Sequence, residues 1–137
     1  MHVLAAVLVL ASPYRVQAAH ICRHEGLAEA AVAARLGTHP TRAQALAVWP
    51  QLLALGRKSV RELRALHPPA SLRADHHAAV DARSAQFDVF AAALAAVRNG
   101  ETPAQAAAGT KSRLIGLVAA ERAAWRRAGI GACAVYG

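Results

Sequence analysis

The chain has very little sulfur. Its 137 residues include only two cysteines, Cys22 shortly after an apolar N-terminal run and Cys133 close to the C-terminus. No CxxC, CxxCH or HExxH pattern is present, which removes the common sequence signals for zinc, haem and zinc-protease sites. Two lone cysteines at opposite ends of a small chain predict one Cys22–Cys133 disulfide, formed in an oxidising compartment. The alternative is two unrelated buried thiols.

Apolar runs long enough to span a membrane are also missing from the sequence. The run at residues 3–11 is much shorter than the roughly 20 residues that a spanning helix needs, but it fits the core of a signal peptide. Small residues at positions 16–18 suit a signal peptidase. We therefore expect residues 1–18 to be a signal peptide and residues 19–137 to form one domain outside the cytoplasm. The segment before the run has His2 and no Lys or Arg, so either the signal is atypical or the true start lies upstream.

Aromatic residues make up only 4% of the chain, whereas alanine occupies 37 positions. Alanine costs the least to place in a helix but buries little apolar surface, so the composition predicts helices around a thin core. Gly and Pro clusters divide the chain into four helices: residues 14–36, from Thr41 to a breaker at residues 67–69, residues 70–98, and from Thr102 to Gly129. Pro50 is expected to kink or split the second helix.

Each predicted helix has an apolar stripe at helical spacing. The stripes contain Tyr14, Ala18, Ile21, Ala28, Val32 and Leu36; Trp49, Leu52, Leu53, Val60 and Leu63; Leu72, His76, Val80, Phe87, Phe90, Leu94 and Val97; and Ala107, Leu114, Leu117, Val118 and Trp125. Four such helices with short connections predict an all-α, antiparallel up-down four-helix bundle. In this topology the first helix starts and the last helix ends at the same pole, which brings Cys22 near Cys133.

Several segments together resemble a known group of proteins. Residues 63–73 read LRALHPPASLR, residues 19–22 read AHIC, residues 98–101 read RNGE, and residues 120–133 read AERAAWRRAGIGAC. This order is similar to that of small secreted or lipoprotein-type, Ala/Arg-rich helical proteins of high-GC Gram-positive bacteria, which have no assigned function. His76 and Gly131 depart from the group's usual residues. The resemblance implies a disulfide-closed helical fold outside the cytoplasm and brings no catalytic residue.

Histidine is the one residue type that suggests a metal or haem site. His20 and His24 lie four residues apart, so both imidazoles can share one face of a helix. His76 lies in the apolar stripe of the third helix, which starts at the same pole of the bundle. A His20/His24/His76 cluster would suit zinc, copper or haem iron. The competing interpretation is that His20 and His24 face solvent and that His76 is a core residue.

Glu121 is predicted to point inward, one turn before Trp125. A buried carboxylate needs a partner, and His76 and Arg83 on the third helix are the candidates. In the expected bundle the end of the fourth helix lies near the start of the third, which favours His76 as the partner of Glu121. We expect these three residues to form a structural polar core. The hydroxyl residues have no base at a recognised spacing, and no glycine-rich phosphate loop precedes a helix. The sequence therefore predicts that the chain is not an enzyme and needs no cofactor.

The formal net charge is +8, and arginine outnumbers lysine fourteen to two. The arginines are spread along the whole chain, which indicates solvated helix faces and no specific nucleic-acid site. Their excess favours anionic partners such as an envelope polymer or a lipid surface. We expect a monomeric, secreted protein of the cell envelope with a binding or structural role. The alternative is a histidine-based carrier of metal or haem.

Overall fold

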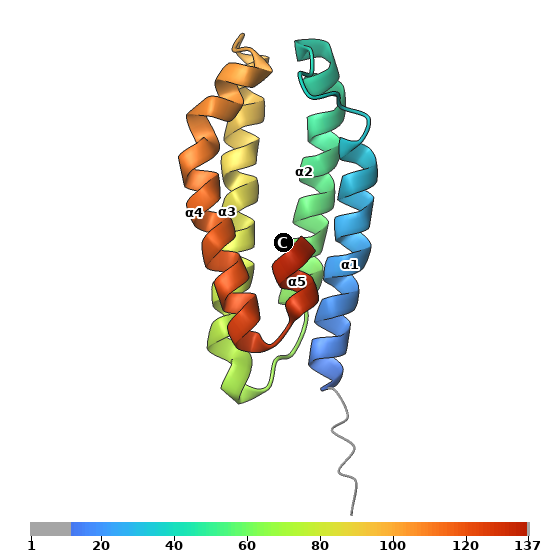
Figure 1. The fold of residues 1–137 in the computed structure, drawn as a ribbon, viewed down its shortest axis with the longest axis vertical. Helices are drawn as coiled ribbons and strands as arrows, with labels where there is room; N and C mark the ends of the chain where they lie inside the picture. Colours follow the sequence, from blue (N-terminus) through green and yellow to red (C-terminus); the bar gives the residue numbers. More distant parts are fainter. Residues whose placement is uncertain (1–11, 137) are drawn as a thin grey trace, which may run out of the picture.

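Within residues 12–136, which the computed structural model describes, every regular element is a helix (Figure 1). The elements are α1 (Pro13–Ala33), α2 (Arg42–Arg64), the 3₁₀ turn η1 (Ala70–Leu72), α3 (Arg73–Arg98), α4 (Pro103–Ala128) and α5 (Gly131–Tyr136). The four long helices pack in up-down order with sequence neighbours antiparallel. The predicted all-α four-helix fold is therefore confirmed. The apolar run at residues 3–11 lies outside the described residues.

Helices α2 and α4 begin with the same local signal, a threonine followed three residues later by a glutamine. The Thr41 hydroxyl accepts a hydrogen bond from the Gln44 N–H at 3.1 Å, and the Gln44 side chain accepts one from the Thr41 N–H at 2.8 Å. Thr102 and Gln105 repeat this arrangement at 3.1 and 2.9 Å. Each capping box satisfies two backbone donors, so local sequence sets both starts. Gly129 ends α4 in the left-handed conformation, with φ of 73°.

The helix bounds differ from the prediction in four places. Helix α1 ends at Ala33 instead of residue 36, and residues 70–72 form a 3₁₀ turn ahead of α3. Helix α2 continues through Pro50 and is not split, because losing one backbone donor leaves the neighbouring turns intact. Helix α5 was not predicted. Six residues between Gly129 and the C-terminus are too few for a helix on their own, so α5 depends on packing.

Helix α5 completes the bundle at one pole. Helices α1 and α2, α2 and α3, and α3 and α4 pack directly, whereas α1 and α4 make almost no direct contact. The chain turns back after α4, and α5 packs against both α1 and α4 at the pole where α1 begins (Figure 1). The side of the bundle between α1 and α4 is therefore joined through α5 at this pole, and the elements described here provide no such connection farther along.

The predicted disulfide is present and lies at this pole. Cys22 on α1 and Cys133 on α5 are bonded, with their Cα atoms 5.1 Å apart, and neither side chain has exposed surface. The bond fixes the end of the chain to the first helix, as the up-down topology requires. Near it, Tyr14, Ala18 and Trp125 are buried.

The buried side chains form two apolar clusters, and a group of buried polar residues lies next to the first. The cluster at the disulfide pole includes Tyr14, Leu63, Val80 and Trp125, and the cluster at the opposite pole includes Ala45, Trp49, Ala93, Leu94, Val97 and Ala106. Glu25, Ser59, Arg83 and Glu121 are buried at intermediate positions along the four long helices. These polar residues adjoin the cluster at the disulfide pole, because Glu121 accepts a hydrogen bond from Trp125 and Arg83 contacts the Cys22 sulfur at 3.8 Å.

The bundle includes residues that the sequence analysis assigned to the signal peptide. Helix α1 begins at Pro13, and Tyr14 and Ala18 have 4% and 0% of their surface exposed. Cleavage after Ala18 would remove both from the core, so the expected cleavage position remains a prediction that the packing does not favour. Between residues 12 and 136, no helix combines the length and the apolar character needed to cross a bilayer.

Removing the disulfide should destabilise the bundle substantially. Cys22 and Cys133 are 111 positions apart, and in the chain-entropy model closing so long a loop contributes about 4–5 kcal/mol, while loss of a native disulfide typically costs about 2–5 kcal/mol. We expect the Cys22→Ser/Cys133→Ser variant to lose free energy of unfolding in this range in urea titrations. The wild type under a reductant is the control and should behave alike. A serine variant as stable as the oxidised wild type would contradict this expectation.

Candidate functional site

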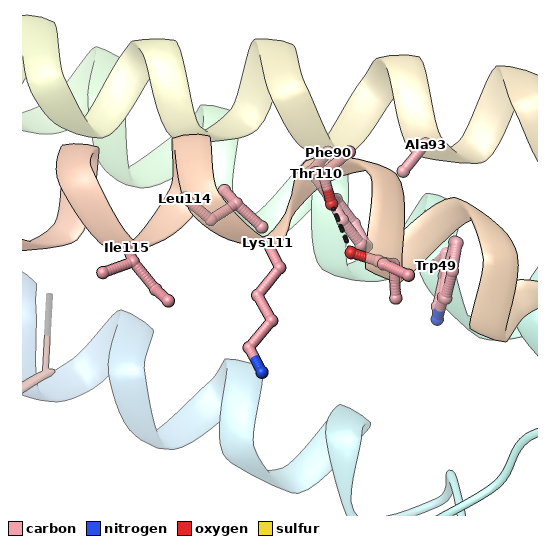
Figure 2. Close-up of a pocket in the computed structure, with 9 residues that line it drawn as sticks. Trp49, Phe90, Ala93, Thr110, Lys111, Leu114 and Ile115 are labelled. Carbon is pink, nitrogen blue, oxygen red and sulfur yellow. Dashed lines mark hydrogen bonds between the residues drawn. The ribbon is translucent and has the colours of Figure 1, made fainter.

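The half of the bundle away from the disulfide contains an apolar cavity. Its volume is about 400 Å³, and α2, α3 and α4 line it with Trp49, Phe90, Ala93, Ala107, Ala108, Thr110, Lys111, Leu114 and Ile115 (Figure 2). We call it the Trp49 cavity. The Thr110 hydroxyl donates to the Ala107 carbonyl of its own helix at 3.0 Å, so this wall presents little polarity. Lys111 projects from α4 toward α1.

Two further hollows adjoin the Trp49 cavity. The first, of about 360 Å³, lies between α1, α2 and α3 and is lined by Gly26, Glu29, Ala30, Ala33, Leu52, Phe87 and Phe90. We call it the Glu29 hollow. The second, of about 230 Å³, is lined by Trp49, Ala107 and the residues around Pro40 and Pro103. Phe90 lines both of the larger spaces. Together they form a groove with α2 and α3 as its floor and α1 and α4 as its walls.

The local sequence explains why this space is not filled. The walls carry small residues, among them Gly26, Ala30 and Ala33 on α1 and Ala107 and Ala108 on α4. Such side chains cannot reach across the gap between α1 and α4. The floor, by contrast, is tightly packed. A Cβ atom at Gly56 on α2 would lie 2.0 Å from the Phe87 ring on α3, so glycine at this position lets the two helices approach closely.

A buried polar network lies beside the groove, at the middle of the bundle. Glu121 Oε2 accepts hydrogen bonds from Arg83 Nε and Trp125 Nε1, and Glu121 Oε1 accepts one from Gln86 Nε2, all at 2.8 Å. Arg83 Nη1 also contacts the Ser59 hydroxyl at 3.4 Å. Glu121 and Arg83 are 0% and 3% exposed. Every oxygen of the buried carboxylate is therefore satisfied, and the network joins α3 to α4.

The expected Glu121–His76 pair is wrong, because Arg83 occupies that role. His76 is buried, as predicted, but its Nδ1 shares a 2.8 Å hydrogen bond with the Tyr14 hydroxyl, and its ring packs edge-on to Tyr14 and Trp125. Burial raises the pKa of Tyr14 to about 12, with a contribution from Asp75 and against the charge of Arg15. Tyr14 therefore stays protonated, and its hydroxyl donates the hydrogen bond to His76 Nδ1. Burial, with the charge of His77, lowers the pKa of His76 despite a backbone hydrogen bond to Leu63.

The structure does not bring His20, His24 and His76 together. His20 and His24 stack with ring centroids 6.0 Å apart on the exposed side of α1, whereas His76 faces inward toward Tyr14. Among residues 12–136, no group of three or more His, Cys, Asp or Glu side chains has the geometry to hold a metal ion. The proposed three-histidine ligand set for zinc, copper or haem iron is therefore not assembled.

Sequence reasoning missed two acidic residues of α1. Glu25 is 1% exposed and accepts from Lys58 Nζ at 2.6 Å, with His24 Nδ1 at 3.2 Å. Burial alone would raise its pKa, but the hydrogen bonds from Lys58 and His24 outweigh burial and lower it. Glu29 lines its hollow. Their spacing was an available signal, because residues 25 and 29 follow the buried Cys22 by three and seven positions and so share its helix face.

Comparison of the chain with protein-family models, with curated proteins and with solved structures gave no match. The resemblance to small secreted Ala/Arg-rich proteins remains a prediction. The candidate site is therefore defined by its own geometry, namely an apolar groove with the half-buried Glu29 at one side.

Arg83 and Glu121 should be strongly coupled. Arg83→Met leaves the buried Glu121 carboxylate without its cation, and breaking such a pair from one side costs about 3–5 kcal/mol. The Arg83→Met/Glu121→Gln variant should recover part of this loss, because the remaining group carries no charge. Urea unfolding of the wild type, both single variants and the double variant measures the coupling. Additivity to within about 0.5 kcal/mol would show that the pair is not coupled.

His76 should make the bundle sensitive to mild acid. The pKa of His76 is lower in the folded protein than its value of about 6.5 in the unfolded chain. At a pH between these two pKa values, the unfolded chain binds a proton that the folded chain does not. The contribution of His76 to stability is therefore complete above about pH 6.5 and is lost as the pH falls through the folded value. We expect His76→Leu to be less stable at neutral pH but to lose less free energy of unfolding on acidification. Parallel pH curves for both proteins would contradict this.

Proposed function

We propose that this chain is a non-catalytic binding protein that works outside the cytoplasm and holds an apolar or amphiphilic small molecule in the groove between α1 and α4. The observation that carries the proposal is the Trp49 cavity. Its volume of about 400 Å³ falls within the range of small-molecule sites, which are mostly apolar and largely pre-formed.

The side chains around the groove support a ligand better than a structural role alone. Trp49 is 8% exposed, whereas Phe87, Phe90, Leu52 and Leu114 keep part of their surface accessible although they belong to predicted core stripes. Ile115, on the cavity wall, is 60% exposed. Apolar groups that converge on one open space would gain about 25 cal/mol for each Å² that a ligand covers.

The setting outside the cytoplasm is supported by the disulfide. A bond that joins the two ends of a small domain persists in oxidising compartments and is rare in the cytosol. It also stabilises the pole opposite to the groove, so the ligand site can stay open without loss of the fold. Because one half of the bundle provides stability and the other half holds the ligand, binding needs no catalytic residues in the groove.

Binding of a neutral apolar probe tests the proposal. We expect the fluorescence of N-phenyl-1-naphthylamine to rise and saturate on titration with the wild-type protein, because the probe moves from water into an apolar site. Ala107→Leu should weaken binding at least severalfold, since the larger side chain enters the groove from an exposed position of α4. Alanine and leucine differ little in helix propensity, so the helix should remain intact.

Ala120→Leu is the matched control, because Ala120 is also exposed on α4 but lines none of the three spaces. It should bind the probe as the wild type does. Absence of a saturable signal, or equal weakening by both substitutions, would refute a ligand site in the groove.

A further inference from the structure

Glu29 gives the groove a charge requirement. Its side chain lines the Glu29 hollow, and its Oε1 is shielded from solvent and has no hydrogen-bond partner among residues 12–136. Burial raises the pKa of Glu29, with Glu25 and Glu121 adding to the shift against the charge of Arg83. The rest of the Glu29 side chain keeps part of its surface accessible, so a donor in the hollow would meet the carboxylate at Oε2 and offset the desolvation of the shielded Oε1.

Resting on the proposed function, we infer that the groove takes a cationic amphiphile, with an ammonium headgroup between the Glu29 carboxylate and the rings of Phe87 and Phe90, and with its apolar chain in the Trp49 cavity. An ammonium group provides up to three donors and a full positive charge. Phenyl faces attract cations, and both rings line the same hollow as Glu29. Phe90 also lines the Trp49 cavity, so one molecule can occupy both spaces.

The neighbouring cations are already engaged elsewhere. Arg83 binds Glu121 through Nε and Nη2, both at 2.8 Å, and Lys58 Nζ binds Glu25 at 2.6 Å and Glu62 at 3.0 Å. The buried carboxylates of Glu25 and Glu121 are thus each paired with a cation, whereas the half-buried carboxylate of Glu29 has no ion pair among residues 12–136. This local negative charge stands against the formal +8 of the whole chain and favours a cation at this place.

Lys111 argues for the opposite headgroup and is the main rival. It lines the Trp49 cavity and could meet an anion there. However, Lys111 is exposed, so water already solvates its charge, and exposed ion pairs contribute little. The Glu29 carboxylate is half-buried, and water cannot reach one of its two oxygens. The stronger demand for a partner therefore lies at Glu29.

A series of ligands with one chain and three headgroups tests the inference. Isothermal titration calorimetry at about pH 8, where decylammonium keeps its charge, compares decylammonium, decan-1-ol and decanoate below their aggregation limits. We expect decylammonium to bind about tenfold or more tightly than decan-1-ol, the scale of one charge-assisted hydrogen bond. Glu29→Gln should remove this preference and leave decan-1-ol binding unchanged.

Asp88→Asn is the matched control, because it makes the same change in net charge at a side chain that is 67% exposed and pairs with Arg57. It should keep the preference, as should Lys111→Gln. Equal binding of all three ligands, or a preference that survives Glu29→Gln, would overturn the inference and leave the apolar groove standing. Tightest binding of decanoate, lost in Lys111→Gln, would assign the headgroup to Lys111. Binding of none of the three would refute the groove as a ligand site together with the inference.

Discussion

The contact of α5 with both α1 and α4, fixed by the Cys22–Cys133 bond, is the constraint on which the rest of the structure depends. Helices α1 and α4 make almost no direct contact, and among the described elements α5 alone packs substantially against both. Its cysteine ties the end of the chain to α1. This connection closes one pole, and no element of the described part of the chain covers the other half of the same side. The groove therefore lies in the half of the α1–α4 side that α5 does not cover.

The two halves of the bundle are held together by different contacts. The Arg83–Glu121 pair borders the apolar cluster at the disulfide pole, where it contacts Cys22 and Trp125. A satisfied buried pair holds α3 to α4 but replaces apolar packing at the middle of the bundle. The disulfide half keeps its fold through covalent and apolar contacts. The groove half is held by the contacts of α2 with α3 and of α3 with α4, which leave its open side available.

Much of the fold follows from local sequence signals, whereas the groove does not. Threonine caps, helix-breaking Gly and Pro clusters and apolar stripes predict the long helices and their order, and the up-down order predicts the disulfide. Helix α5 escaped prediction because its formation depends on packing. The stripe of the fourth helix placed Ala107 on the inner face although it is exposed, and Leu114 is only half-buried, since periodicity shows which face turns inward but not whether a neighbour covers it. The partner of Glu121 was also wrong, because helix polarity fixes the pole and not which side chain reaches the carboxylate.

The shortage of large side chains has opposite effects at the two poles. At the disulfide pole, Ala18, Ala79, Ala124 and Ala128 are fully buried or nearly so, and small residues let α5 approach α1 and α4 closely. In the other half, the same residue type on α1 and α4 faces a space that no helix within residues 12–136 fills. Large apolar groups are then concentrated on the floor, at Trp49, Phe87 and Phe90. A molecule that covers this floor binds the folded state alone and so stabilises it in proportion to its occupancy. The small side chains that leave the core thin, and so make the disulfide important for stability, thus also provide room for a ligand.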